Sequence, residues 1–229
     1  MLRINSLSTM KLINIITLLA ITYACHSAET KSNSKDEILT PLAEELNTVE
    51  DPSMEIDKSK AGLNLDSLLT NSARQLLKSI KNKEWGEFAS YIHPIKGVRF
   101  SPYAYIDTTN AIVLRQNTFI LGVEDVKMWG YYDGSEDSIM LTLENYFNRF
   151  VYDTDFLHAE EMSINKILGA GNSLNNRMEI YPNSQFISFY FSGFDPKYDG
   201  LDWTSLNLFF EKLNGELFIV AVIHDQWTI

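Results

Sequence analysis

The last apolar segment of the chain carries the residues best suited to acid–base chemistry. His224 is followed directly by Asp225, and an imidazole beside a carboxylate can act as a general base near neutral pH. Adjacent residues on a strand point to opposite faces of a sheet, so Asp225 is a poor partner for His224. A catalytic His224 requires a carboxylate from elsewhere, and the candidates are Asp202, Asp195 and Glu179. The alternative is a structural histidine tied into the end of the sheet.

Two other histidines have weaker claims. His93 precedes Pro94 at the predicted end of a helix, where a cationic imidazole interacts favourably with the last carbonyls; the alternative is catalysis by His93 with Asp202. His158 follows the acidic segment 153–155, but this spacing matches no defined zinc or calcium site.

Two acidic segments, 133–137 and 195–202, gather carboxylates around a glycine turn. Neither follows the order of ligands in an EF-hand loop. Asp and Gly also favour turns for backbone reasons alone, so we interpret both segments as solvated turns. The sequence predicts no metal site and no cofactor.

Aromatic side chains are the stronger indication of a binding site, because many lie on or near predicted strands and turns. Aromatic rings stack on sugar and ring faces, and a concave sheet with Tyr and Trp inside and Arg and Asn at the rim suits a glycan or another small polar ligand. The alternative is that most of these rings pack in the core or at its rim. The candidate ligand-binding residues are Arg99, Tyr103, Tyr105, Trp129, Tyr131, Asn172, Trp203 and Trp227, with Asn175 beside them.

Helical spacing of apolar residues predicts the first elements that would position these side chains. Helices are expected over 64–80, behind a cap at Asn64, and over 85–92. A weak helix is expected over 109–119, and another begins after Thr142, which can cap it.

The remaining elements are predicted to be strands. The clearest is a hairpin formed by 206–213 and 216–224, because Asn214 and Gly215 between them suit the positive φ angles of a type I′ turn. Other extended segments are 98–105 and 185–191, and 127–142 forms a strand, a turn at Asp133–Gly134 and a second strand.

Helices followed by antiparallel strands define an α+β domain whose N-terminal helices pack on one face of a curved, mainly antiparallel sheet. This order is similar to the nuclear-transport-factor-two-like cone, in which the sheet curls around a pocket open at one end. A circular permutation or another helix-on-sheet fold is the alternative. The cone is shared by enzymes, binding modules and proteins without known activity, so the resemblance implies no particular chemistry.

The first 24 residues have the pattern of a secretory signal peptide. Arg3 and Lys11 form the positive region, and the apolar stretch 12–20 is too short to span a bilayer. Cys25, which follows Ala24, is the only cysteine of the chain. The sequence predicts export to the cell envelope, since a signal peptide directs the chain out of the cytoplasm.

Residues 22–25 resemble a bacterial lipobox, which implies lipidation of Cys25 and attachment to a membrane. The match departs from the usual pattern at Thr22, where Leu is common, and at Tyr23, where a small residue is common. The alternative is cleavage after Ala24, which would leave a free thiol in an oxidising compartment. Lipidation explains why the single cysteine lies at this position.

Composition divides the rest of the chain in two. Residues 25–62 are polar, acidic and almost free of aromatic residues, which predicts a flexible tether, and 63–229 are expected to form the single folded domain. The chain has 30 acidic and 19 basic residues and a net charge of −11. Such a charge repels phosphate backbones and argues against nucleic-acid binding.

Several segments of the folded part resemble an uncharacterised family of exported bacterial proteins and lipoproteins. They are YIHPIKGVRFSPYAY (91–105), WGYYDG (129–134), GNSLNN (171–176), GFDPKYDGLDW (193–203) and HDQWTI (224–229). The resemblance implies an envelope location and one domain, and it carries no activity or site residues.

The leading hypothesis is a lipid-tethered, non-catalytic module that binds a small or carbohydrate-like ligand or a partner protein. It is motivated by aromatic residues without a catalytic constellation. The second hypothesis is an envelope hydrolase or isomerase that uses His224 or His93 with Asp202. It requires an imidazole and a carboxylate within hydrogen-bond reach inside one cavity.

Overall fold

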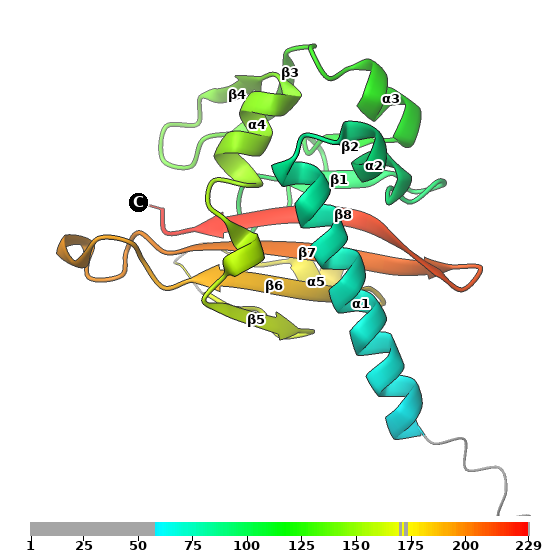
Figure 1. The fold of residues 1–229 in the computed structure, drawn as a ribbon. Coiled ribbons are helices and arrows are strands. Elements are labelled where there is room, and N and C mark those ends of the chain that lie inside the picture. The colour runs from blue at the N-terminus through cyan, green and yellow to red at the C-terminus, as the bar shows by residue number, and fades with distance from the viewer. Residues whose placement is uncertain (1–57, 170, 172–173, 229) are drawn as a thin grey trace, which may run out of the picture. The chain divides into compact units, whose positions relative to one another are not determined.

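A computed structural model of the chain describes residues 58–169, 171 and 174–228. Figure 1 shows helices lying against one face of a curved sheet, with a smaller pair of strands beyond them. The predicted signal peptide, Cys25, most of the predicted tether and Asn172 lie outside the described residues. Within the described ranges, no helix has both the length and the apolar composition needed to cross a bilayer.

The main sheet has six strands in the order β2-β1-β8-β7-β6-β5. Its strands are β1 (Val98–Ser101), β2 (Val113–Leu114), β5 (Glu161–Ile164), β6 (Gln185–Phe191), β7 (Thr204–Leu213) and β8 (Glu216–Gln226). Four of the five strand pairs are antiparallel, and β1 pairs with β8 in parallel. The predicted mainly antiparallel sheet is therefore confirmed.

The predicted hairpin is the centre of this sheet. Asn214 and Gly215 have φ angles of 53° and 91°, as a type I′ turn requires, and β7 and β8 pair along their whole length. Side chains alternate between the two faces of β7: Leu206 and Leu208 join the main core, while Phe209 belongs to a smaller cluster. One face of the hairpin thus carries the helices, and the other faces a second layer.

The helical layer is formed by α1 (Lys58–Lys81), α2 (Trp85–Ser90), α3 (Gln116–Leu121) and α4 (Leu143–Phe150). In Figure 1, α1 runs diagonally across the sheet, and its side chains Leu69, Ala73, Leu76 and Leu77 are fully buried. The α4 prediction is confirmed in detail, because the Thr142 hydroxyl accepts a hydrogen bond from the backbone N–H of Asn145 at 3.3 Å.

Two predicted helices differ from the structure. The first helix begins at Lys58, six residues before the expected cap at Asn64, because its first turns lack the apolar spacing on which the prediction depended. The weak helix over 109–119 is replaced by β2 and α3. Pairing of Val113 and Leu114 with β1 overrides the local helical preference of that segment.

The predicted strand–turn–strand unit is confirmed as β3 (Lys127–Tyr131) and β4 (Ser138–Leu141), which form a separate two-stranded sheet. An aromatic cluster joins it to the rest of the domain. Trp129 of β3 stacks on Tyr146 of α4 with ring centroids 3.9 Å apart, and Phe100 of β1 meets both rings edge-on, at 5.5 Å and 6.0 Å. The α+β class, with helices packed on a curved sheet, is confirmed.

The short elements are η2 (Phe156–His158), α5 (Arg177–Ile180) and η3 (Pro196–Tyr198). Of these, α5 lies on the face of the sheet opposite α1 (Figure 1). Together with the chain before it, α5 supplies the second layer.

The position of Phe100 gives a stability prediction. Phe100→Ala removes a fully buried ring that contacts rings from α2, α3, α4 and β3, so it should lower the free energy of unfolding by about 3–5 kcal/mol. Urea denaturation measures the loss. Phe194→Ala is the matched control, because that ring is 57% exposed and its loss should cost less than about 1 kcal/mol. Equal losses in the two variants would contradict the central role of Phe100.

Candidate functional site

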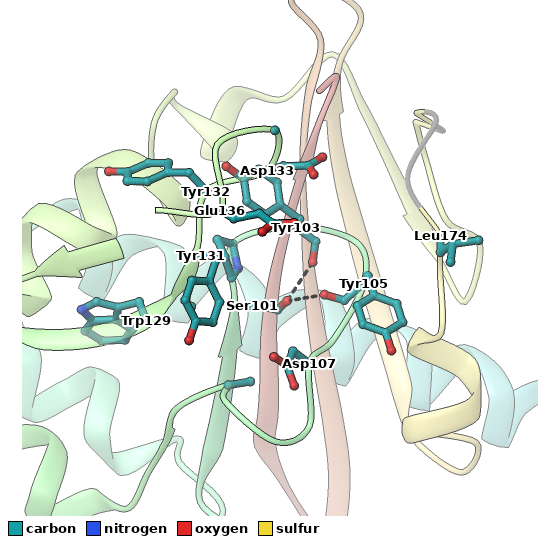
Figure 2. Close-up of a pocket in the computed structure, with 14 residues that line it drawn as sticks. Ser101, Tyr103, Tyr105, Asp107, Trp129, Tyr131, Tyr132, Asp133, Glu136 and Leu174 are labelled. Carbon is teal, nitrogen blue, oxygen red and sulfur yellow. Dashed lines mark hydrogen bonds between the residues drawn. The ribbon is translucent and has the colours of Figure 1, made fainter. Parts of the chain in front are cut away.

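A cavity of about 630 Å³ opens between the chain that follows β1 and the β3–β4 hairpin. Tyrosines and carboxylates lie around it (Figure 2). Its first wall comes from Ser101, Pro102, Tyr103, Tyr105, Asp107 and Ala111, its second from Trp129, Gly130, Tyr131, Tyr132, Asp133, Gly134 and Glu136, and Leu174 lies at one edge.

The first wall is held by side chains that bond to its backbone. The Ser101 hydroxyl lies within hydrogen-bond distance of the carbonyl oxygens of Tyr103, at 2.8 Å, and Tyr105, at 3.1 Å (Figure 2). The Asn176 side chain accepts from the N–H of Ile106 at 2.8 Å and donates to its carbonyl at 3.0 Å. The turn is therefore fixed from both sides, and Tyr105 is left 51% exposed toward the cavity.

Asp107 ends this wall as a charged group. A hydrogen bond from the Asn110 side chain lowers the pKa of the Asp107 carboxyl, with further bonds from the backbone N–H groups of Thr109 and Asn110. The carboxylate is thus negative at neutral pH.

The second wall follows from an irregularity in β3. The pairing of β3 with β4 shifts between Met128 and Tyr131, and Gly130 has a φ of 129°, which favours glycine. The Tyr131 side chain lines the cavity and is 45% exposed. Burial raises the pKa of Tyr103, so its phenol is neutral at physiological pH.

The cavity brings together four of the eight predicted ligand-binding residues: Tyr103, Tyr105, Trp129 and Tyr131. Trp129 differs from the tyrosines because its side chain is fully buried, and its indole N–H donates to the carbonyl of Leu141 at 2.8 Å. Its indole therefore supports the wall from behind.

The other four candidates lie elsewhere. Arg99 lines a separate cavity of about 200 Å³ and donates to the Tyr181 hydroxyl at 3.2 Å. Trp203 is 7% exposed, and its ring leaves no room for a side chain at Gly169, where an added Cβ would lie 2.8 Å from it. Trp227 is 37% exposed and lines neither cavity. Asn172 is not among the described residues.

His224 is fully buried and bonded on both ring nitrogens. Its Nδ1 lies 3.1 Å from the carbonyl oxygen of Pro102, and its Nε2 lies 2.9 Å from Thr204 Oγ1 and 3.3 Å from Asp153 Oδ2. Thr204 Oγ1 is itself 3.1 Å from Asp153. Thr204 thus contacts both the imidazole and the carboxylate.

Asp153 is a partner that sequence reasoning missed, because it lies 71 residues before His224 and belongs to no shared motif with it. Burial raises the pKa of Asp153, but hydrogen bonds from His224 and Thr204 and the charge of His224 outweigh it and hold that pKa below its ordinary value. The pair joins β8 to the chain after α4. It does not line the described cavity wall.

The side chains of His93 and Asp202 both accept hydrogen bonds from backbone N–H groups of nearby turns. These bonds join neither residue to another catalytic candidate. His93 Nδ1 accepts from the backbone N–H groups of Ile95 and Lys96 at 3.2 Å and 3.0 Å, and burial lowers its pKa. Asp202 Oδ2 accepts from the N–H groups of Phe194 and Asp195, at 3.0 Å and 2.8 Å. The imidazole of His93 thus accepts hydrogen bonds in a turn, whereas the predicted cap was a cation.

The two acidic turns and His158 form no metal centre. Among the residues that the structure describes, no three His, Cys, Asp or Glu side chains are grouped so that they could hold a metal ion. His158 pairs with Asp155 at 2.9 Å. Asp195 accepts from the N–H of Lys197 at 3.0 Å, in a local turn.

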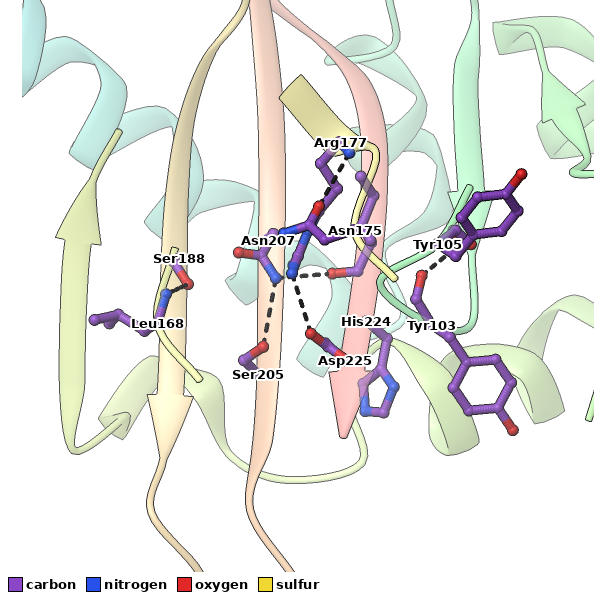
Figure 3. Close-up of polar contacts among 12 residues, drawn as sticks. Tyr103, Tyr105, Leu168, Asn175, Arg177, Ser188, Ser205, Asn207, His224 and Asp225 are labelled. Carbon is purple, nitrogen blue, oxygen red and sulfur yellow. Dashed lines mark hydrogen bonds and ion pairs between the residues drawn. The ribbon is translucent and has the colours of Figure 1, made fainter. Parts of the chain in front are cut away.

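A polar cluster lies on the other face of β8 (Figure 3). Arg177 of α5 pairs with Asp225 at 3.1 Å, and both side chains are only 2% exposed. Asn175 accepts from Arg177 Nε at 3.0 Å. Burial raises the pKa of Asp225, and the Arg177 charge opposes this shift. As the alternation of β8 predicts, Asp225 faces away from His224.

Comparisons with known proteins give no family for this chain. No protein-family model matches it, and no curated protein matches it. Among solved structures, it is similar to Aln2 from a Streptomyces species, with 8% identity, a TM-score of 0.33, and coverage of 71% of this chain and 90% of Aln2. It is also similar to a variant of a protein called Rd1NTF2_05, with 12% identity, a TM-score of 0.29, and coverage of 73% and 99%.

Similarities at these TM-scores carry no argument about family or function. The α+β class rests on the structure itself. The resemblance to exported bacterial proteins stays a prediction.

The Asp153–His224 contact gives a pH prediction. Asp153 has a lower pKa in the folded chain than its ordinary value of 3.8, so its charged form stabilises the fold above about pH 4, and this contribution is lost as the pH falls through the folded pKa. Asp153→Asn should therefore lower the free energy of unfolding by about 1–3 kcal/mol at neutral pH. The difference from wild type should shrink below about pH 4.

Denaturant unfolding at a series of pH values measures this difference. Asp137→Asn is the control, because the Asp137 side chain is exposed and should change stability little at any pH. A loss in Asp153→Asn that does not depend on pH would contradict a stabilising charge on Asp153.

Proposed function

We propose that this chain is a non-catalytic binding module whose small ligand lies in the cavity between the two tyrosine-bearing walls. The observation that carries the proposal is the pair of half-exposed rings, Tyr105 and Tyr131, one on each wall. Phenol rings left open to solvent in a concave site offer stacking faces and hydroxyl groups to a ligand.

The walls are also held in place before any ligand arrives. Ser101 and Asn176 fix the first wall by hydrogen bonds, and the buried Trp129 fixes the second. A site whose walls are fixed in advance loses little conformational entropy on binding.

The second candidate function is an envelope hydrolase or isomerase, and the observation in its favour is the contact between His224 and Asp153. A general base must reach the proton that it removes. His224 is fully buried and its Nδ1 is occupied by Pro102, so this pair supports the architecture behind the cavity. The position of the imidazole favours binding over catalysis.

A ligand screen tests the binding proposal. We expect at least one neutral oligosaccharide, small alcohol, amine or quaternary ammonium compound to raise the Tm of the protein. Replacing both rings, Tyr105→Ala with Tyr131→Ala, should weaken that binding by about tenfold or more, since each stacked ring contributes about 1 kcal/mol. Calorimetric titration of the ligand that scores in the screen measures the loss.

Tyr198→Ala is the matched control, because Tyr198 is 48% exposed and lies outside the cavity. Binding that survives the double replacement would show that the ligand sits elsewhere. A screen in which no compound binds the wild-type protein would contradict the proposed function.

We further propose that the module works in the cell envelope, tethered to a membrane through lipid on Cys25. The support is the leader pattern of residues 1–24 and the position of the only cysteine directly after it. Several acyl chains at about 0.8 kcal/mol per buried methylene would hold the protein on the membrane.

Metabolic labelling with a palmitate analogue tests the anchor. Wild-type protein should carry the label and sediment with membranes, while Cys25→Ser should lose both properties, because only the thiol of Cys25 can be acylated at this site. Equal labelling of the two proteins would overturn the proposed anchor without affecting the binding site.

A further inference from the structure

We infer that the ligand of this cavity is an organic cation, such as a quaternary ammonium or a protonated amine. The inference rests on the proposed function and adds the chemical class of the ligand. It is carried by the sign of the charges on the walls together with the tyrosine faces between them.

The charges on the walls all have one sign. Of the fourteen described residues that line the cavity, three are acidic, namely Asp107, Asp133 and Glu136, and none is Lys, Arg or His. A neutral sugar can donate hydroxyl hydrogen bonds to the three carboxylates but gains no attraction between opposite charges, and an anion would be repelled. A cation is the ligand charge that this potential attracts.

The carboxylates lie on both sides of the rings. Asp107 belongs to the first wall, and Asp133 and Glu136 belong to the second (Figure 2). A cation placed over the tyrosines would therefore have negative charge on two sides. Tyrosine faces themselves attract cations, an interaction that strengthens when the cation is quaternary and weakly hydrated.

Two arginines act on the walls from outside the cavity lining. The charge of Arg99 helps hydrogen bonds to lower the pKa of Asp107, and the charge of Arg149 opposes the burial that raises the pKa of Tyr103. Arg99 donates to the Tyr181 hydroxyl and lies within 3.5 Å of the carbonyl of Thr108, on the wall of the smaller cavity. Arg149 lies over the ring of Phe150, 5.0 Å from its centroid, and within 3.5 Å of the Gln226 side chain. Neither arginine is among the residues that line the cavity, and the three acidic residues that do line it outnumber these two cations.

An organic cation fits better than a metal ion. A metal such as calcium needs six to eight oxygen ligands close together, whereas in the described part of the chain no three His, Cys, Asp or Glu side chains are grouped so that they could hold a metal ion. The cavity of about 630 Å³ is large enough for a small molecule, and the tyrosine faces between the carboxylates suit a ligand with carbon atoms around its charge.

Choline and 3,3-dimethylbutan-1-ol form the pair of probes for this proposal, because they have the same shape and differ in charge. Calorimetric titration of the full chain should show choline binding about tenfold or more tightly than the neutral alcohol. Choline affinity should also fall between about 20 mM and about 500 mM NaCl, as screening shortens the range of the carboxylate charges.

The double variant Asp133→Asn with Glu136→Gln should weaken choline binding about tenfold, since two nearby charges are lost. Both residues are exposed, so the fold should be retained, and an unchanged Tm checks this. Asp137→Asn is the matched control, because Asp137 is an exposed carboxylate of the same turn that does not line the cavity. Its choline affinity should equal that of wild type.

The outcomes separate the charge of the ligand from the existence of the site. Two results would contradict a cationic ligand and leave the proposed binding function unaffected. One is equal binding of choline and its neutral analogue, and the other is binding of a neutral oligosaccharide where choline does not bind. Choline binding that resists the double variant would also overturn this proposal. Failure of every probe, including those of the wider screen, would overturn the binding function itself.

Discussion

The orientation of one strand, β1, decides the geometry of the whole candidate site. Phe100 points into the core, where it meets Trp129 and Tyr146, so its neighbour Ser101 points the other way. Ser101 then folds the following chain back through the carbonyls of Tyr103 and Tyr105. A shift of one residue in the pairing register of β1 would exchange Phe100 and Ser101 between the two faces of the sheet. The Ser101 hydroxyl would then be buried among aromatic rings, and its hydrogen bonds to the first wall would be lost. The cost of that exchange fixes the register.

His224 and Asp225 of β8 differ from the acidic residues that line the cavity, because they contact partners from other segments. On one face the buried His224 contacts Asp153, whose side chain is 20% exposed, and on the other face Asp225 and Arg177 form a buried pair. Both contacts join distant segments. Buried charges of this kind require partners, and so they specify which segments meet. The carboxylates of Asp133 and Glu136 are exposed and form no such pair. Position in the fold, more than residue type, separates the acids that join segments from those that we propose to contact a ligand.

Local signals in the sequence predict much of this fold. The Asn214–Gly215 turn needs two positive φ angles and has them, and the Thr142 cap is an interaction over three residues. Both depend on neighbours along the chain. The segment 109–119 was predicted wrongly because its structure is decided by pairing with β1, a contact that no local pattern encodes.

The same distinction applies to the candidate site. Tyr103, Tyr105 and Tyr131 could be named from residue type because the cavity takes them from turns beside strands. The partner of His224 could not, since Asp153 comes from 71 residues away, and alternation along β8 could only exclude Asp225. Trp129 has the same chemistry as a ligand-stacking residue, and only its register against Tyr146 shows that the core uses it.

The two walls of the cavity differ in how they are held, and this difference bears on how the site works. The first wall is held by hydrogen bonds with the side chains of Ser101 and Asn176, whereas the second is held by the stacking of Trp129 on Tyr146. Both anchors lie behind the rings that face the cavity. Tyr105 and Tyr131 therefore remain half exposed without loosening the backbone beneath them. Rings that are open to solvent but fixed at their base have lost much of their conformational freedom already, so a ligand that stacks on them gains contact area at little entropic cost.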